Sequence, residues 1–207
     1  MISGRKSSSP SRVARLRWWL AGLVLLAGPA WALELDGLMS LLSQRKSGEA
    51  RFTEERFVSG LNGPLLASGR LTFAAPDRFA RYTLQPRVES MEVEGNRVLL
   101  KRGSRSVQMA LDAVPELAVL SDAMRGTLNG DAQTLQRHFR AEVSGTDKQW
   151  TLILTPLDSR LAGQVSQLEI GGVQADVRSI ELTLSGGDRS LMRVEPLTAV
   201  QAGPGGP

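Results

Sequence analysis

The sequence predicts an α+β fold in which one helix precedes a large antiparallel sheet and one or two further helices are inserted into that sheet. Two observations carry the prediction. Short segments with an apolar residue at every second position, typical of half-buried strands, recur between residues 51 and 194. Turn-forming sequences separate them at short intervals, so each segment can fold back on its predecessor. We expect about ten or eleven strands, enough for a sheet to curl.

Three segments have helical spacing instead. Residues 33–47 form the first, and Gly48 is a candidate for its end. Residues 111–125 and 131–138 are the inserted ones. The apolar positions of the first are Leu35, Leu38, Met39 and Leu42; those of the second are Leu117, Leu120 and Met124.

The strands are predicted in two groups, one on each side of the inserted helices. The first group has a turn at Asn62-Gly63-Pro64, and the second has a hairpin connection at Gly171-Gly172. The first group is 51–58, 65–73, 79–84, 88–93, 97–102 and 105–109; the second is 139–144, 149–155, 165–170, 177–184 and 190–194.

The net charge of +4 invites a nucleic-acid function, but the basic excess lies at one end of the chain. Residues 1–32 hold five basic residues and no acidic one, whereas residues 33–207 hold 20 basic and 21 acidic residues. The few aromatic residues beyond position 32 are scattered and form no stacking platform for bases. We therefore expect no nucleic-acid partner.

Residues 1–32 have the order of parts of a secretory signal peptide. A basic stretch ends at Arg17, an apolar run of about ten residues follows, and Ala30 and Ala32 supply an A-x-A cleavage site. The run is short beside the roughly 20 residues of a membrane-spanning helix, which favours a cleaved signal over an uncleaved anchor. Export to a bacterial periplasm is the simplest reading, with eukaryotic secretion as the alternative. The predicted domain is 33–196, and residues 197–207 form a flexible Gly/Pro-rich tail.

Catalytic chemistry is sparse in this sequence. There is no cysteine, and His138 is the single histidine, so thiolate, Cys-zinc and His-rich metal sites are excluded. No nucleophile elbow, zinc-protease motif, phosphate loop or dinucleotide fingerprint occurs. Glu54 and Glu55 are neighbours on a strand and point to opposite faces, so they cannot flank one bond. We expect a protein that is not an enzyme and has no metal or cofactor.

Several weak motifs occur together in a characteristic order. The chain resembles the periplasmic outer-membrane lipoprotein carrier (LolA) family through that order. The motifs are Phe52-Thr53, then Gly69, Leu71, Pro76 and Phe79, then Glu89-Ser90 with Gly95, an inserted helix over 114–125, and Leu154-Thr155-Pro156.

The resemblance implies an unclosed β-barrel whose concave apolar face is covered by helices, leaving a cavity that shields acyl chains in the periplasm. It further implies a monomer that takes a lipoprotein or lipid cargo from an inner-membrane exporter to an outer-membrane acceptor. The lipid-binding residues it implies are Phe52, Leu71, Phe73, Phe79, Met91, Leu99, Leu117, Leu120, Met124, Trp150 and Leu152.

The chain departs from the family pattern at Ala75, where the family has a basic residue that helps to hold the covering helices closed. This indicates a divergent branch and leaves the cargo open among lipoproteins, glycolipids and lipid-linked pigments. A periplasmic lipid-sensing regulatory protein that binds a membrane partner is the alternative function.

Overall fold

The structure, a computed structural model, describes residues 33–113 and 115–197, without the side chains of residues 112 and 115–120. The predicted signal peptide and residues 198–207 of the predicted tail lie outside the described residues. Within the described ranges, no helix has both the length and the apolar character needed to cross a bilayer.

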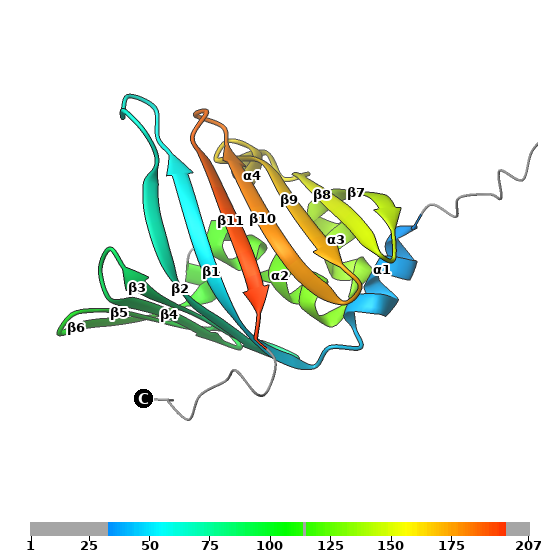
Figure 1. Cartoon of the computed structure of the whole chain (residues 1–207), viewed down its shortest axis with the longest axis horizontal. Coiled ribbons are helices and arrows are strands. Elements are labelled where there is room, and N and C mark those ends of the chain that lie inside the picture. Colours follow the sequence, from blue (N-terminus) through cyan, green and yellow to red (C-terminus); the bar gives the residue numbers. More distant parts are fainter. Residues whose placement is uncertain (1–32, 114, 198–207) are drawn as a thin grey trace, which may run out of the picture. The chain divides into compact units, whose positions relative to one another are not determined.

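A single antiparallel sheet of eleven strands forms the frame (Figure 1), in the order β6-β5-β4-β3-β2-β1-β11-β10-β9-β8-β7. Strands β6 and β7 are its two edges, so the sheet is unclosed and the predicted fold class is confirmed. The first six strands are β1 (Ser47–Phe57), β2 (Leu65–Ala74), β3 (Arg78–Gln85), β4 (Glu89–Glu94), β5 (Arg97–Arg102) and β6 (Arg105–Ala110). The other five are β7 (Phe139–Thr146), β8 (Gln149–Pro156), β9 (Val165–Val173), β10 (Asp176–Leu184) and β11 (Arg189–Pro196).

The described helices lie before the first group of strands, between the two groups, and within the second group between β8 and β9. A 3-10 turn over Leu111–Ala113 leads into the long inserted helix. The helices are α1 (Leu35–Leu42), α2 (Pro115–Asn129), α3 (Ala132–His138) and α4 (Ser159–Ala162). Carboxylates cap two of them: Asp131 accepts from the Thr134 amide at 3.0 Å, and Asp158 accepts from the Leu161 amide at 3.1 Å.

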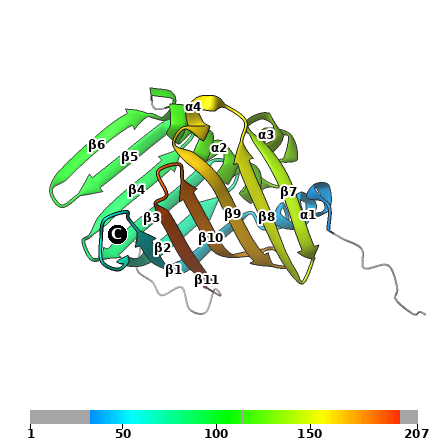
Figure 2. The ribbon, with the colours of Figure 1, turned by 90° about the horizontal axis from the view of Figure 1, so that it is seen from above.

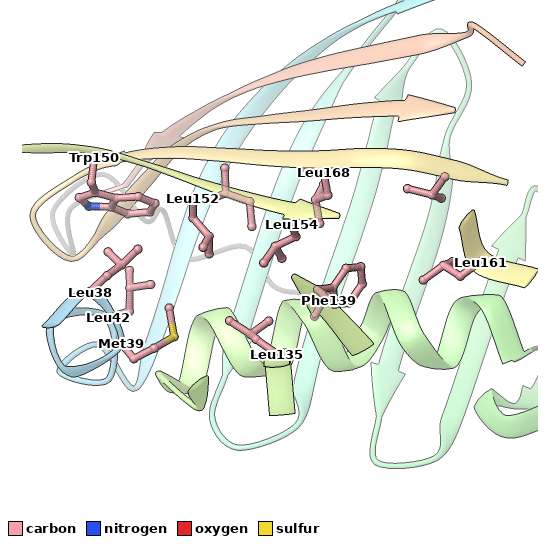
Figure 3. Packing of buried hydrophobic residues seen from close by; sticks show 13 residues of the cluster. Leu38, Met39, Leu42, Leu135, Phe139, Trp150, Leu152, Leu154, Leu161 and Leu168 are labelled. Atoms are coloured by element: carbon pink, nitrogen blue, oxygen red, sulfur yellow. The ribbon is translucent and has the colours of Figure 1, made fainter. Parts of the chain in front are cut away.

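Helices α1, α2 and α3 cover one face of the sheet, which we call the inner face (Figures 1 and 2). The main core lies between these helices and β7–β10, where apolar side chains from both layers meet (Figure 3). Trp150 is 1% exposed within this core, and its indole Nε1 donates to the Gln174 carbonyl at 2.8 Å. The largest fully buried side chains are Trp150, Phe52, Phe139, Leu38, Leu135, Leu152, Leu154, Leu161 and Val98.

Three glycines lie inside strands, contrary to prediction. The first helix ends at Leu42, and Gly48 belongs to β1, where an added Cβ would lie 2.5 Å from the Phe73 ring. Gly171 and Gly172 belong to β9 and not to a hairpin turn, and a Cβ added at Gly172 would lie 2.1 Å from the Trp150 ring. Gly48 and Gly172 each leave room for a neighbouring aromatic ring to lie close to the sheet.

Candidate functional site

An apolar cavity of about 110 Å³ lies between α2 and the inner face of the sheet. Met124 and Leu128 line it from the helix. Leu71, Phe73 and Phe79 line it from the first group of strands, and Ile170, Ile180 and Val194 line it from the second. The hydroxyl of Thr127, also at the wall, is satisfied by the Ala123 carbonyl at 2.8 Å. The cavity therefore favours hydrocarbon over polar ligands.

Strand register brings these residues together from distant parts of the sequence. Phe73 on β2 lies opposite Gly48 on β1 and opposite Phe79 on β3, so the two phenylalanines share the inner face. The second group of strands joins through β1 and β11, where Ala50 lies opposite Pro196. Both Ala50 and Pro196 line the cavity.

Polar contacts hold α2 in place over the cavity. The guanidinium of Arg125 donates to the Gly95 carbonyl in the β4–β5 turn, and the Asn129 amide donates to the Pro76 carbonyl in the β2–β3 turn. Arg125 also lies 3.5 Å from the Asp122 carboxylate. Ala75, beside Pro76, carries no charge. The arginine that holds α2 to the sheet in this chain is Arg125, which belongs to α2.

The predicted binding residues fall into four groups. Leu71, Phe73, Phe79 and Met124 line the cavity together. The side chains of Leu117 and Leu120 lie outside the described part of the chain.

The third group lies on the inner face but away from the cavity wall. Met91 packs on a second cluster formed by Val93, Val98 and Leu111. Trp150 and Leu152 are buried in the main core, and Phe52 is 2% exposed.

Leu99 lies on the other face of the sheet, and its predicted place in the cavity is wrong. Its partners across β4 and β6 are Glu92 and Gln108. Three apolar residues run consecutively in β5, so alternation alone does not choose the inner ones. The pairing of Val98 with Val93 assigns the inner face to Val98, and therefore the outer face to Leu99.

A buried charge cluster on the inner face was not predicted from the sequence. Glu54 is 5% exposed; Arg81 and Ser190 donate to its carboxylate, and Arg56 lies 3.5 Å away. Burial alone would raise the pKa of Glu54, but the hydrogen bonds from Arg81 and Ser190 and the charges of Arg81 and Arg56 outweigh it and hold that pKa below its ordinary value. Its partners come from three strands, a combination that no local motif reveals.

The described residues offer little that resembles a catalytic or metal centre. The His138 imidazole lies 3.8 Å from the Asp122 carboxylate, and both side chains are one-third exposed. No group of three or more His, Asp or Glu side chains within these ranges is placed to hold a metal ion.

Comparison with known families matches residues 27–202 to the outer membrane lipoprotein carrier protein LolA-like family. The chain belongs to this family. An outer-membrane lipoprotein carrier protein from Methylibium petroleiphilum is 27% identical over 195 residues, which is 89% of this chain and 88% of that one. The LolA-like assignment confirms the predicted resemblance.

Solved structures with a similar course of the chain share less sequence. A LolA-superfamily protein from Nitrosomonas europaea is 8% identical, with a TM-score of 0.42 over 78% of this chain and 91% of that one. A chain of the Pseudomonas aeruginosa MucA/MucB complex is 13% identical, with a TM-score of 0.42 over 80% of this chain and 58% of that one. At these scores the LolA-like assignment rests on the sequence match.

Proposed function

We propose that this protein is a periplasmic carrier that shields the acyl chains of a lipoprotein or another envelope lipid in the cavity under α2. The observation that carries the proposal is the apolar wall formed by Leu71, Phe73, Phe79 and Met124. The family's description as lipoprotein carriers supports it. Residues 1–32 act as the export signal in this proposal, and the protein works as a monomer without catalysis, cofactor or nucleic acid.

The physics of acyl chains requires such a shield. Moving one methylene group out of water stabilises it by about 0.8 kcal/mol, so exposing an acyl chain of roughly 15 methylenes to water costs about 12 kcal/mol. Free diffusion of cargo between membranes is therefore negligible. We propose that the carrier receives its cargo from an inner-membrane exporter and delivers it to an outer-membrane acceptor by direct contact.

Loading must enlarge the cavity. Its 110 Å³ is small beside the roughly 300–1,000 Å³ of typical ligand pockets. Helix α2 is the wall that can move, because its contacts with the turns at Gly95 and Pro76 are a few hydrogen bonds rather than a strand ladder. Met124 on this wall has a flexible side chain that adapts to different acyl chains, as do Met91 and Met109 in the second cluster.

The decisive experiment is recovery of bound lipid. The protein is purified from envelope extracts without denaturation, bound lipid is identified by mass spectrometry, and affinity for a fluorescent fatty acid is titrated. We expect bound lipid and saturable binding. Repeated recovery without lipid, together with no fatty-acid binding, contradicts the proposal.

A matched pair of variants locates the binding. Leu71→Asn places an amide in the cavity, whereas Leu99→Asn makes the same change on the outer face of the sheet. We expect Leu71→Asn to weaken fatty-acid binding at least about tenfold, because a buried amide without a partner is costly. Leu99→Asn is expected to bind as the unchanged protein does; equal losses would place the lipid elsewhere.

Crosslinking in the periplasm separates carriage from the sensing alternative. Transient contacts with an exporter and an outer-membrane acceptor are the expected result for a carrier. A single stable complex with a signalling membrane protein would instead support a lipid-sensing regulator.

A further inference from the structure

Exposed apolar side chains gather on one end of the sheet. Six of the nine large apolar residues that are exposed in the described part of the chain lie at the tips of three successive hairpins. These are Leu61, Leu65 and Leu66 at the β1–β2 tip, Leu84 and Val88 at the β3–β4 tip, and Val107 beside the β5–β6 tip, each at least 52% exposed. We call residues 58–66, 84–88 and 101–107 the hairpin rim.

The antiparallel order puts the three tips at the same end of their strands. They project on one side of the sheet, at the left in Figure 2. Glu89 pairs with Arg102, which brings the second tip beside the third. Ser68 is the last residue of β2 that pairs with β3, opposite Gln85, and β1 and β2 stay paired as far as Arg56 and Leu65, so the first tip extends beyond the second. All three tips therefore present exposed leucine or valine side chains at the same end of the sheet.

The charges of the hairpin rim have one sign. Its three segments contain no Asp or Glu and four basic residues, Arg87, Lys101, Arg102 and Arg105. Lys101 and Arg102 pair with carboxylates of β4 at 3.2 and 2.9 Å. Arg87 and Arg105 are exposed, and their side chains pair with no group in the described part of the chain.

Aliphatic side chains on separate tips with unpaired arginines beside them suit a lipid surface. Leucine and valine enter the boundary between head groups and acyl chains, while arginine meets anionic head groups. A protein partner is less well matched, because the rim has no tryptophan or tyrosine, the side chains that dominate protein hot spots. We propose that the hairpin rim docks this protein on the surface of an anionic lipid membrane. The docking goes beyond the carrier function and does not depend on cargo in the cavity.

The test is flotation of the protein with lipid vesicles. Vesicles of phosphatidylcholine with phosphatidylglycerol are compared with vesicles of phosphatidylcholine alone, at low and high salt. We expect binding to the anionic vesicles that salt weakens. No preference for phosphatidylglycerol would overturn the proposal.

Three variants assign the binding to the rim. The double variants Leu61→Ser with Leu66→Ser, and Arg87→Glu with Arg105→Glu, are each expected to bind at least about tenfold more weakly. Val173→Ser is the matched control, because Val173 is an exposed valine at the end of β9 and outside the rim. All these positions are exposed, and thermal melting checks that each variant folds. Rim variants that bind normally, or an equal loss in Val173→Ser, contradict the proposal.

A cavity variant separates docking from cargo binding. Phe79→Ala is expected to lower fatty-acid affinity and to leave vesicle flotation unchanged. The rim variants are expected to lower vesicle flotation and to leave fatty-acid affinity unchanged. Loss of flotation in Phe79→Ala would mean that the cavity, not the rim, holds the vesicle. If the rim variants lose function in cells although the unchanged protein does not bind vesicles, the rim binds a membrane protein instead of lipid, and the proposal is overturned.

Discussion

The guanidinium of Arg81 on β3 pairs with the buried carboxylate of Glu54 on β1, although β2 lies between these strands. Gly69 on β2 has no side chain to block the path, and the Arg81 guanidinium passes over the Phe52 ring at 4.6 Å from its centroid. The inner face thus carries a buried ion pair as well as apolar side chains.

Glu54→Gln is expected to lower the free energy of unfolding by about 2 kcal/mol, because it leaves Arg81 partly buried without its counter-charge. Denaturant unfolding measures the change. Glu55→Gln is the control: Glu55 is 39% exposed on the opposite face and lies 3.9 Å from Arg193, so its loss is expected to stay below about 0.5 kcal/mol. Equal losses in the two variants would contradict a structural role for the buried pair.

The same pair predicts a pH dependence. The pKa of Glu54 is lower in the folded protein than the value of about 4.3 for an unfolded glutamate. The stabilisation is therefore fully present above about pH 4.3 and is lost as the pH falls through the folded pKa. Thermal melting from neutral to acid pH should show the difference between the unchanged protein and Glu54→Gln shrinking below about pH 4. A constant difference over this range would contradict the assignment.

Local patterns predicted the sheet well, because alternation and turn chemistry act over a few residues. The eleven predicted strands are confirmed, and every apolar cavity position named from β2 and β3 follows that alternation. Long-range pairing decided what the sequence could not. The face on which Leu99 lies depends on the register between β5 and β4. The need for glycine at position 172 depends on the close approach of the Trp150 ring. The burial of Glu54 depends on partners from three strands. Helix α4 was missed because its four residues are too few to show a helical period.

Phe79→Ala is expected to weaken fatty-acid binding more than it weakens the fold. Phe79 is only half-buried at the cavity wall, so its truncation should cost less than the 3–5 kcal/mol of a fully buried phenylalanine. Ligand titration beside thermal melting measures both effects.

Phe139→Ala provides the opposite case. Phe139 is 1% exposed, and it lies in the main core and not at the cavity wall. The variant's free energy of unfolding should therefore fall by about 3–5 kcal/mol, while the fatty-acid affinity of the folded fraction changes little. An unchanged affinity in Phe79→Ala would remove this residue from the site.

Gly172→Ala tests whether the close approach of Trp150 fixes the glycine. The added methyl group would lie 2.1 Å from the Trp150 ring and 2.6 Å from the Asp176 carbonyl oxygen. We therefore expect the free energy of unfolding to fall by about 1–3 kcal/mol. Gly186→Ala is the matched control, because a Cβ there meets nothing within 4 Å, and its effect should stay within about 0.5 kcal/mol. If both variants melt alike, the ring contact does not constrain position 172.

Arg125→Met tests how firmly α2 is held over the cavity. The change keeps much of the aliphatic stem but removes the hydrogen bond to the Gly95 carbonyl, a charge-assisted bond of about 1.5–3 kcal/mol. Local opening of α2 should become at least about tenfold more frequent, seen as faster amide hydrogen exchange in the second half of the helix. Arg140→Met on β7, an exposed arginine, should leave exchange in α2 unchanged. Uniformly faster exchange across the sheet as well would mean that Arg125 supports the whole fold and not the position of α2.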